Sequence, residues 1–273
     1  ALRQLNGHNM SKWIVQKKFK TLPRLNAPIM IEGLPGMGQV GKIAVDFLID
    51  KLKPKLLYKI YSHDFMHSVY FNDSGFVELP AVCIYYVKGK GNDILFLAGD
   101  DQPASQRASY EFSEKIVDFV QELGCREIIT LGGIGMPHEI KKPAVFGAVT
   151  NKVTLKKYEK LGGINFKINS KIDAIVGASG LLLGIAQLRG MSGVALLAET
   201  YAHQLHLGFR EAKSILEQLK KILNLSVDLS PLDRETENYE KAQARAKEDR
   251  ENTRLSKLRS QFADSKPEAQ YIG

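Results

Sequence analysis

The stretch from Pro28 to Ile49 constrains the fold of this chain more than any other part of the sequence. An apolar run at Ile29 to Ile31 is typical of a buried strand, and apolar residues recur at helical spacing after Gly41. Glycines allow a tight turn and a close contact between helix and strand. The sequence therefore predicts a tight crossover from strand to helix, whose structural glycines are Gly33, Gly36, Gly38 and Gly41.

The same turn has to be tested as a nucleotide-binding motif. Gly36 to Gly41 spells G-x-G-x-x-G, but the next expected strand, Leu56 to Tyr61, ends without the acidic residue that would hold a ribose. As a phosphate loop it has Ile43 where a Ser or Thr would bind magnesium. We therefore expect a structural turn. The alternative is an enzyme that binds a nucleotide or nucleoside through residues 33–41.

Strand-like and helix-like patterns alternate along most of the chain, which predicts an α/β fold with a largely parallel sheet flanked by helices. Several of the strand-like runs are continuously apolar, as in strands buried on both faces. The expected strands are 29–31, 56–61, 81–87, 93–98, 127–131, 174–176 and 193–198. The expected helices are 41–52, 105–123, 151–161, 180–189 and 209–223.

Composition divides the chain into three segments. Residues 1–10 show no periodicity and end in a methionine, so we expect a vector-derived leader there. Residues 11–229 form the expected α/β body. From Leu232 to about Ala263 the chain has no Gly or Pro and is dominated by Glu, Lys, Arg, Ala and Gln, which predicts one long helix. Residues 230–273 are thus expected to form a polar C-terminal helix and a flexible tail.

Charge and cysteine content limit the classes of function. The net charge is +8, yet residues 231–273 carry nine basic and nine acidic residues, so the excess is spread over the body. The basic residues there form no recognisable nucleic-acid module, and we expect no nucleic-acid partner. No apolar run reaches the roughly 18 residues of a membrane span, so no membrane partner is expected. Two cysteines without a C-x-x-C pair fit a cytoplasmic protein.

Other candidate chemistry is sparse. Asp100 and Gln102 follow the expected strand 93–98, at the edge where α/β proteins usually place ligands, and they mark a candidate ligand edge. Ser179 lacks the G-x-S-x-G context of an activated nucleophile. The pairs His63 with His67 and His203 with His206 lack the further ligands of a metal site. We expect no catalytic residues, no metal and no cofactor.

Several motifs spread over about residues 28–229 resemble the archaeal branch of the proteasome assembly chaperone family, which is related to the eukaryotic proteasome assembly chaperone 2 type. The matching residues are Ile31 to Gly38 with Val40 to Lys42, Gly99 and Asp100 with Gln102 and Pro103, Thr130 to Gly133, Gly177 to Gly190, and Leu196 to Thr200. Together they are far more specific than a single glycine-rich turn.

The resemblance implies a phosphorylase-like α/β fold without an established enzyme site. It also implies a homo-oligomer that engages the α-subunits of the proteasome core particle as an assembly chaperone or binding factor. Some members dock through a C-terminal ending of a hydrophobic residue, a tyrosine and any residue. Here Gln270 precedes the tyrosine, which is third from last. The residues expected to bind the partner are Tyr271, Ile272 and Gly273.

Overall fold

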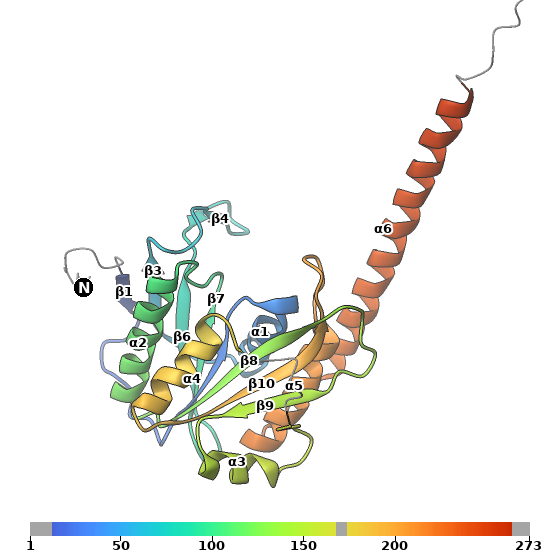
Figure 1. Cartoon of the computed structure of the whole chain (residues 1–273). Helices are drawn as coiled ribbons and strands as arrows, with labels where there is room; N and C mark the ends of the chain where they lie inside the picture. The colour runs from blue at the N-terminus through green and yellow to red at the C-terminus, as the bar shows by residue number, and fades with distance from the viewer. Residues whose placement is uncertain (1–12, 168–173, 264–273) are drawn as a thin grey trace, which may run out of the picture. The chain divides into compact units, whose positions relative to one another are not determined.

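The computed structural model describes residues 13–167 and 174–263, and most of the described chain forms one large mixed sheet with helices on both faces (Figure 1). The eight strands of this sheet, in spatial order, are β1 (Trp13–Lys17), β3 (Lys55–Ser62), β6 (Val82–Val87), β7 (Ile94–Gly99), β2 (Ile29–Gly33), β8 (Glu127–Met136), β10 (Ser192–Tyr201) and β9 (Val145–Val149). A separate hairpin pairs β4 (Tyr70–Phe71) with β5 (Val77–Glu78).

Parallel pairing is confined to the middle of the sheet. β7, β2, β8 and β10 run parallel to one another, whereas β1, β3 and β6 on one side and β9 on the other are added by antiparallel pairing. The predicted α/β class with flanking helices is confirmed, and the largely parallel character holds for these central strands. β2 and β7 are almost completely buried because helices cover both of their faces, and β8 and β10 are buried mainly in their first halves.

Five helices and one short turn of 3-10 helix belong to the described part of the body. They are η1 (Met37–Gln39), α1 (Val40–Leu52), α2 (Gln106–Glu122), α3 (Lys152–Glu159), α4 (Ala178–Leu188) and α5 (Phe209–Leu223). α2 and α4 pack side by side on one face of the sheet, and α1 and α5 pack together on the other (Figure 1). α3 contacts β9 and β10.

The hydrophobic core under α2 and α4 forms because apolar side chains recur on one face of each strand and of each helix. Met30, Leu97 and Ile128 point to the same face from neighbouring strands, and Phe112 and Leu182 reach down from the two helices. All five side chains are completely buried. A sheet face and two helical stripes therefore close one continuous core.

The sequence prediction located the central strands and the helices, with α5 matched to the residue. It was wrong for Ala174–Val176, which is not a strand but the approach to α4. It also missed β1 and β9, the outermost strands of the sheet. Gly177, at φ +90°, turns the chain into α4. The three apolar residues before it therefore lead into a helix and do not form a strand.

The C-terminal unit is a single helix, α6 (Ser230–Ala263). By density of contacts, the chain separates into two compact units between Leu229 and Ser230. Of the side chains described between Asp233 and Ala246, all are exposed except Thr236 and Tyr239, which are half-buried. No helix in the described residues is long and apolar enough to cross a membrane.

Candidate functional site

The carboxyl ends of the central strands meet at one edge of the sheet, which we call the carboxyl edge. β2 ends at Gly33, β7 at Gly99, β8 at Met136 and β10 at Tyr201. In open α/β sheets this edge is the usual place for a ligand. The turn after β2, the loop after β7 and the first residue of α4 are brought together here.

Three of the four predicted turn glycines are so closely packed that a side chain would not fit. A Cβ atom on Gly33 would lie 2.3 Å from the carbonyl oxygen of Gly41, and one on Gly41 would lie 2.4 Å from that of Leu131. Gly38 has φ +59°, and a Cβ there would meet the Thr200 hydroxyl at 2.5 Å. Gly36 has open space and an extended backbone. That the turn serves structure rather than nucleotide binding stays a prediction, for which this packing is the physical reason.

Lys42, which would bind the phosphate in a phosphate loop, makes contacts with the protein instead. Its Nζ atom donates to the carbonyl oxygen of Gly99 at 3.2 Å and pairs with Asp46 at 2.8 Å. The lysine thus ties α1 to the end of β7. A phosphate at the turn would have to attract it away from both contacts.

The two predicted ligand-edge residues are placed in different surroundings. The Gln102 side chain donates through Nε2 to the carbonyl oxygen of Pro35 at 2.7 Å and accepts from the Ala178 amide at 3.1 Å, so it links the glycine-rich turn to the start of α4. Asp100 accepts from the Ala81 amide at 3.4 Å and lines a cavity of about 630 Å³ beside α1, which Gln102 does not line. They do not share one site.

Glu32 is a buried carboxyl group that the sequence analysis did not single out. It lies on β2 with no exposed surface, and its Oε1 accepts from the Leu34 amide at 3.0 Å and from the Ser179 hydroxyl at 3.3 Å. Its Oε2 makes no well-formed hydrogen bond among the described residues, although the Leu131 backbone also interacts with the carboxyl group and lowers its pKa. Burial raises the pKa of Glu32 from 4.5 to about 7. A lone acid in the apolar run IMIEG was the available signal.

Thr130 lies beside Glu32 and is also buried. The two residues occupy paired positions on β8 and β2, so their side chains project from the same face of the sheet. The Thr130 hydroxyl, like Glu32 Oε2, makes no hydrogen bond among the described residues. Buried polar atoms in native proteins are nearly always paired, so two neighbours without partners mark a place where a further group is expected.

A second buried acid contacts the other side of the turn. Glu211 on α5 accepts from the Thr200 hydroxyl at 3.2 Å and lies 2.9 Å from Nε2 of His206. The Gly208 amide donates to the carbonyl oxygen of Gly38 at 2.8 Å. This cluster fastens the loop after β10 to the turn after β2. The described residues contain no cluster of His, Cys, Asp and Glu suited to a metal ion.

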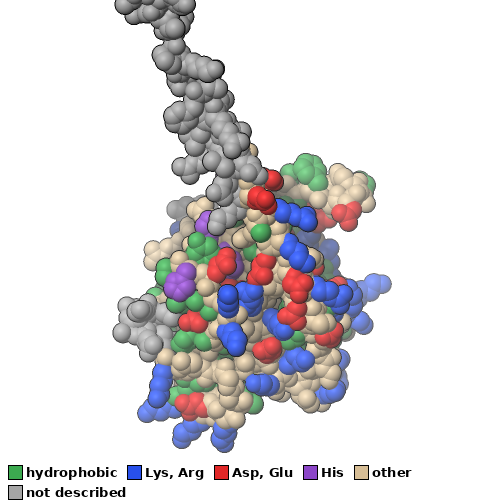
Figure 2. Space-filling view, turned by 90° about the vertical axis from the view of Figure 1, so that its right-hand side faces the viewer, with side chains coloured by type: hydrophobic (Ala, Val, Ile, Leu, Met, Phe, Trp, Pro, Cys, Tyr) green, Lys and Arg blue, Asp and Glu red, His purple; other side chains and the backbone are tan. Residues whose placement is uncertain are grey.

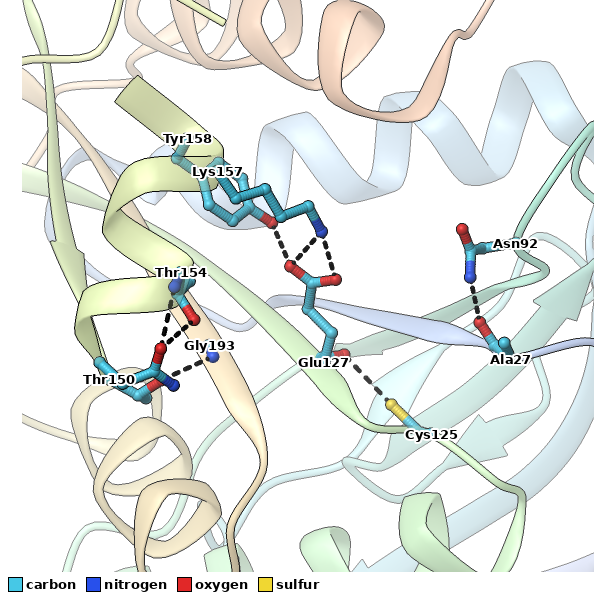
Figure 3. Close-up of polar contacts among 10 residues, drawn as sticks. Ala27, Asn92, Cys125, Glu127, Thr150, Thr154, Lys157, Tyr158 and Gly193 are labelled. Atoms are coloured by element: carbon cyan, nitrogen blue, oxygen red, sulfur yellow. Dashed lines mark hydrogen bonds and ion pairs between the residues drawn. The ribbon is translucent and has the colours of Figure 1, made fainter. Parts of the chain in front are cut away.

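At the amino ends of the same strands, the principal polar side chains are paired (Figure 3). Glu127 accepts from Lys157 at 2.6 and 2.7 Å and from the Tyr158 hydroxyl at 2.7 Å, which holds α3 to the start of β8. The Thr150 hydroxyl accepts from the Gly193 amide at 2.9 Å. These contacts fasten elements to one another.

The surface shown in Figure 2 carries Lys and Arg side chains interspersed with Asp and Glu. Several lysines of the described chain are paired with acidic side chains, among them Lys59 with Glu78 at 3.2 Å. Nucleic-acid sites are usually uniformly basic, and this face is not. The predicted partner-binding residues Tyr271, Ile272 and Gly273 lie outside the described residues.

The arrangement defines an α/β protein whose glycine-rich strand exits are tightly packed. Residues 30–247 match the sequence profile of the PAC2 family, and the chain belongs to that family.

Individual relatives extend this match over nearly the whole chain. The structure is similar to Pyrococcus furiosus PbaB, described as an archaeal proteasome activator, with 36% identity and a TM-score of 0.80 over 87% of this chain and 100% of that one. It is also similar to P. furiosus PbaA, an archaeal homolog of proteasome-assembly chaperone, with 28% identity and a TM-score of 0.73 over 92% and 99% of the two chains. The Methanocaldococcus jannaschii protein MJ1210 is 29% identical over 95% of this chain and 98% of its own.

Proposed function

We propose that this protein is a non-enzymatic factor that binds the α-subunits of the proteasome core particle and acts as an assembly chaperone or activator. The observation that carries the proposal is the similarity to PbaB, at 36% identity along 87% of the chain. PbaA, whose description names a proteasome-assembly chaperone, supports the same role from a second relative. We place this function in the cytoplasm.

Self-association through the body is part of the proposal. An exposed apolar surface lies on the segment that contains the β4–β5 hairpin, and we call it the hairpin patch. Its members, all between 42% and 74% exposed, are Met66, Val69, Tyr70, Phe71, Phe76, Val77 and Leu79. A two-stranded hairpin is marginally stable in water, and an exposed patch of this kind marks an interaction site. A further copy of this chain is the occupant we propose.

The C-terminal unit supplies the proposed contact with the proteasome. α6 has 34 residues, so it extends for about 50 Å at 1.5 Å per residue. It precedes the tail that ends in Tyr271, Ile272 and Gly273. An exposed aromatic side chain in a short segment is a common anchor in peptide recognition. Several tails on one oligomer would bind more tightly than one, because each bound tail raises the effective concentration of the next.

The function is tested by mixing the full chain with purified archaeal core particles and measuring complex formation by mass photometry. We expect a complex that contains more than one copy of the chain. Absence of any complex at micromolar concentration contradicts the proposal. Titration with NAD, ATP and nucleosides tests the enzyme alternative, and micromolar binding lost in Gly38→Ala would favour it.

Self-association is tested separately by the double substitution Phe71→Asp and Phe76→Asp. Both rings are at least 70% exposed, so the change should leave folding intact while lowering the oligomeric mass. Val153→Asp, at an equally exposed position on α3, is the matched control and should leave the mass unchanged. Equal masses for the unmodified chain, the double variant and the control would show that the hairpin patch is not part of the interface.

A further inference from the structure

A cleft of about 500 Å³ lies at the carboxyl edge, between the turn after β2, the exit of β8 and the start of α4. Gly132 on β8 contributes to the space because it has no side chain, and a Cβ there would approach Leu197 to 3.2 Å. Leu34, Ile134 and Ile175 add apolar wall. The cleft is thus shaped for a ligand with a small apolar body.

Ser179 stands between this cleft and the buried carboxyl group of Glu32. The residue lines the cleft, and its hydroxyl donates to Glu32 Oε1 at 3.3 Å. A hydroxyl that donates to a carboxylate becomes a better acceptor on its other side, because hydrogen bonds in a chain polarise one another. The Ser179 hydroxyl oxygen can therefore accept a hydrogen bond from a group in the cleft.

The acceptor capacity of this corner exceeds what the protein uses. Glu32 Oε2 and the Thr130 hydroxyl are buried and make no well-formed hydrogen bond among the described residues. The Gln102 amide, the other polar side chain at the cleft, is already committed at both ends, to Pro35 and Ala178. Neither Glu32 nor Thr130 lines the cleft, so a ligand there meets the Ser179 hydroxyl rather than these two atoms. The negative charge of Glu32 behind Ser179 disfavours an anionic ligand.

We propose that the cleft binds a small molecule in which an apolar body carries a planar N–H donor group, such as an amidine, a guanidine or a carboxamide. The donor group contacts the Ser179 hydroxyl, and the Glu32 carboxylate behind it favours a positive charge. The apolar body lies over Gly132 between Leu34 and Leu197. This site is independent of the proposed binding to the proteasome.

Three molecules with one ring and nearly one shape test the proposal: benzamidine, benzamide and benzoate. They carry a cationic donor group, a neutral donor group and an anionic acceptor group. Binding to the full chain is measured by ligand-observed NMR at pH 8, where Glu32 is largely ionised given its pKa of about 7. Because hydrogen bonds to charged groups are strong, we expect benzamidine to bind about tenfold more tightly than benzoate, with benzamide between them.

Two substitutions locate the interaction. Glu32→Gln keeps the acceptor for Leu34 and Ser179 but removes the charge, and should weaken benzamidine about tenfold while changing benzamide little. Glu127→Gln removes a carboxylate at the opposite edge of the sheet and is the matched control, with no expected effect. Circular dichroism and melting temperature confirm that each variant is folded.

Several results would overturn the proposal. Absence of binding by all three molecules at millimolar concentration would show that the cleft does not recognise this chemistry. Equal binding of benzamidine and benzoate, or tighter binding of benzoate, would show that Glu32 does not select the ligand. Undiminished benzamidine binding in a folded Glu32→Gln protein would place the ligand elsewhere.

Discussion

The α/β body and the C-terminal helix are stabilised by different kinds of interaction. The body closes a core in which residues from distant parts of the sequence meet, such as Trp13 and Phe112, with ring centroids 5.7 Å apart. Between Asp233 and Ala246, α6 has only exposed or half-buried side chains and gains support from local pairs such as Glu237 with Lys241. We therefore expect stability to reside in the body, and the exposed side chains of α6 to tolerate substitution.

Truncation of aromatic side chains should give the largest difference between the two units. Phe112 is completely buried in the core, and Phe112→Ala should lower the free energy of unfolding by about 3–5 kcal/mol. The matched change on α6, Tyr239→Ala, should cost about 0.5 kcal/mol or less. Urea unfolding monitored by circular dichroism gives both values. Similar losses in the two variants would show that α6 contributes to stability as much as the body does.

Glu32→Gln should stabilise the body, by an amount that depends on pH. Burial raises the pKa of Glu32 from 4.5 to about 7, so between these pH values the unfolded chain ionises while the folded chain stays protonated. Stability is therefore lost as pH rises from 4.5 to 7, by about 3 kcal/mol at 1.36 kcal/mol per pKa unit. The variant removes this loss.

Unfolding of both proteins at pH 4 and pH 8 checks this expectation. The variant should match the wild type at pH 4 and exceed it at pH 8. A variant that is less stable than the wild type at pH 8 would show that the charged carboxylate is satisfied in the folded protein.

A smaller effect is expected at the amino ends of the strands. Lys157 pairs with Glu127, but its side chain is 49% exposed, so solvent screens the interaction. Lys157→Met should cost about 1 kcal/mol or less, and the difference should shrink further in 1 M salt. Thermal unfolding at low and high salt measures it. A larger loss that is insensitive to salt would mean that the aliphatic stem of Lys157, not its charge, holds α3 in place.

The smallest effect is expected for a change of charge on α6. Glu237→Gln removes a pair whose atoms are 3.9 Å apart, which is worth about 0.3–0.5 kcal/mol of local helix stability. The melting temperature of the body should not change. A shift of several degrees would show that the C-terminal unit contributes to the stability of the body after all.

Local sequence patterns predicted the elements whose period is strong. The apolar runs of β2 and β7 and the helical pattern of α5 are visible in a single stretch of sequence, and the structure confirms them. β1 and β9 are outer strands with mostly half-buried residues. β1 has only three apolar residues before Gln16 and Lys17, whereas the run VFGAV of β9 was a signal that the prediction did not use. Their pairing depends on β3 and β10, which lie elsewhere in the sequence.

The candidate site was less predictable because its contacts are long-range. The bond from Ser179 to Glu32 spans 147 positions, and that from Ala178 to Gln102 spans 76. Gln102 was marked as a ligand-edge residue from its place after a strand, whereas the fold uses its amide to connect two backbones. Asp100 and Gln102 both lie at the carboxyl edge, as the sequence pattern predicts, but that this edge binds a ligand stays a prediction, and the role of Gln102 depends on the packing of α4.

We propose that the C-terminal tail carries the contact with the proteasome, and deletion of Tyr271 to Gly273 is the test of this proposal. The affinity for core particles is measured by surface plasmon resonance for the full chain, for the deletion, and for a control in which residues 268–270 are replaced by serine. The deletion should weaken binding about tenfold or more, because avidity multiplies the loss from each tail, while oligomeric mass and melting temperature stay unchanged. The control should bind like the full chain. Undiminished binding by the deletion variant would contradict the claim and assign the contact to the body.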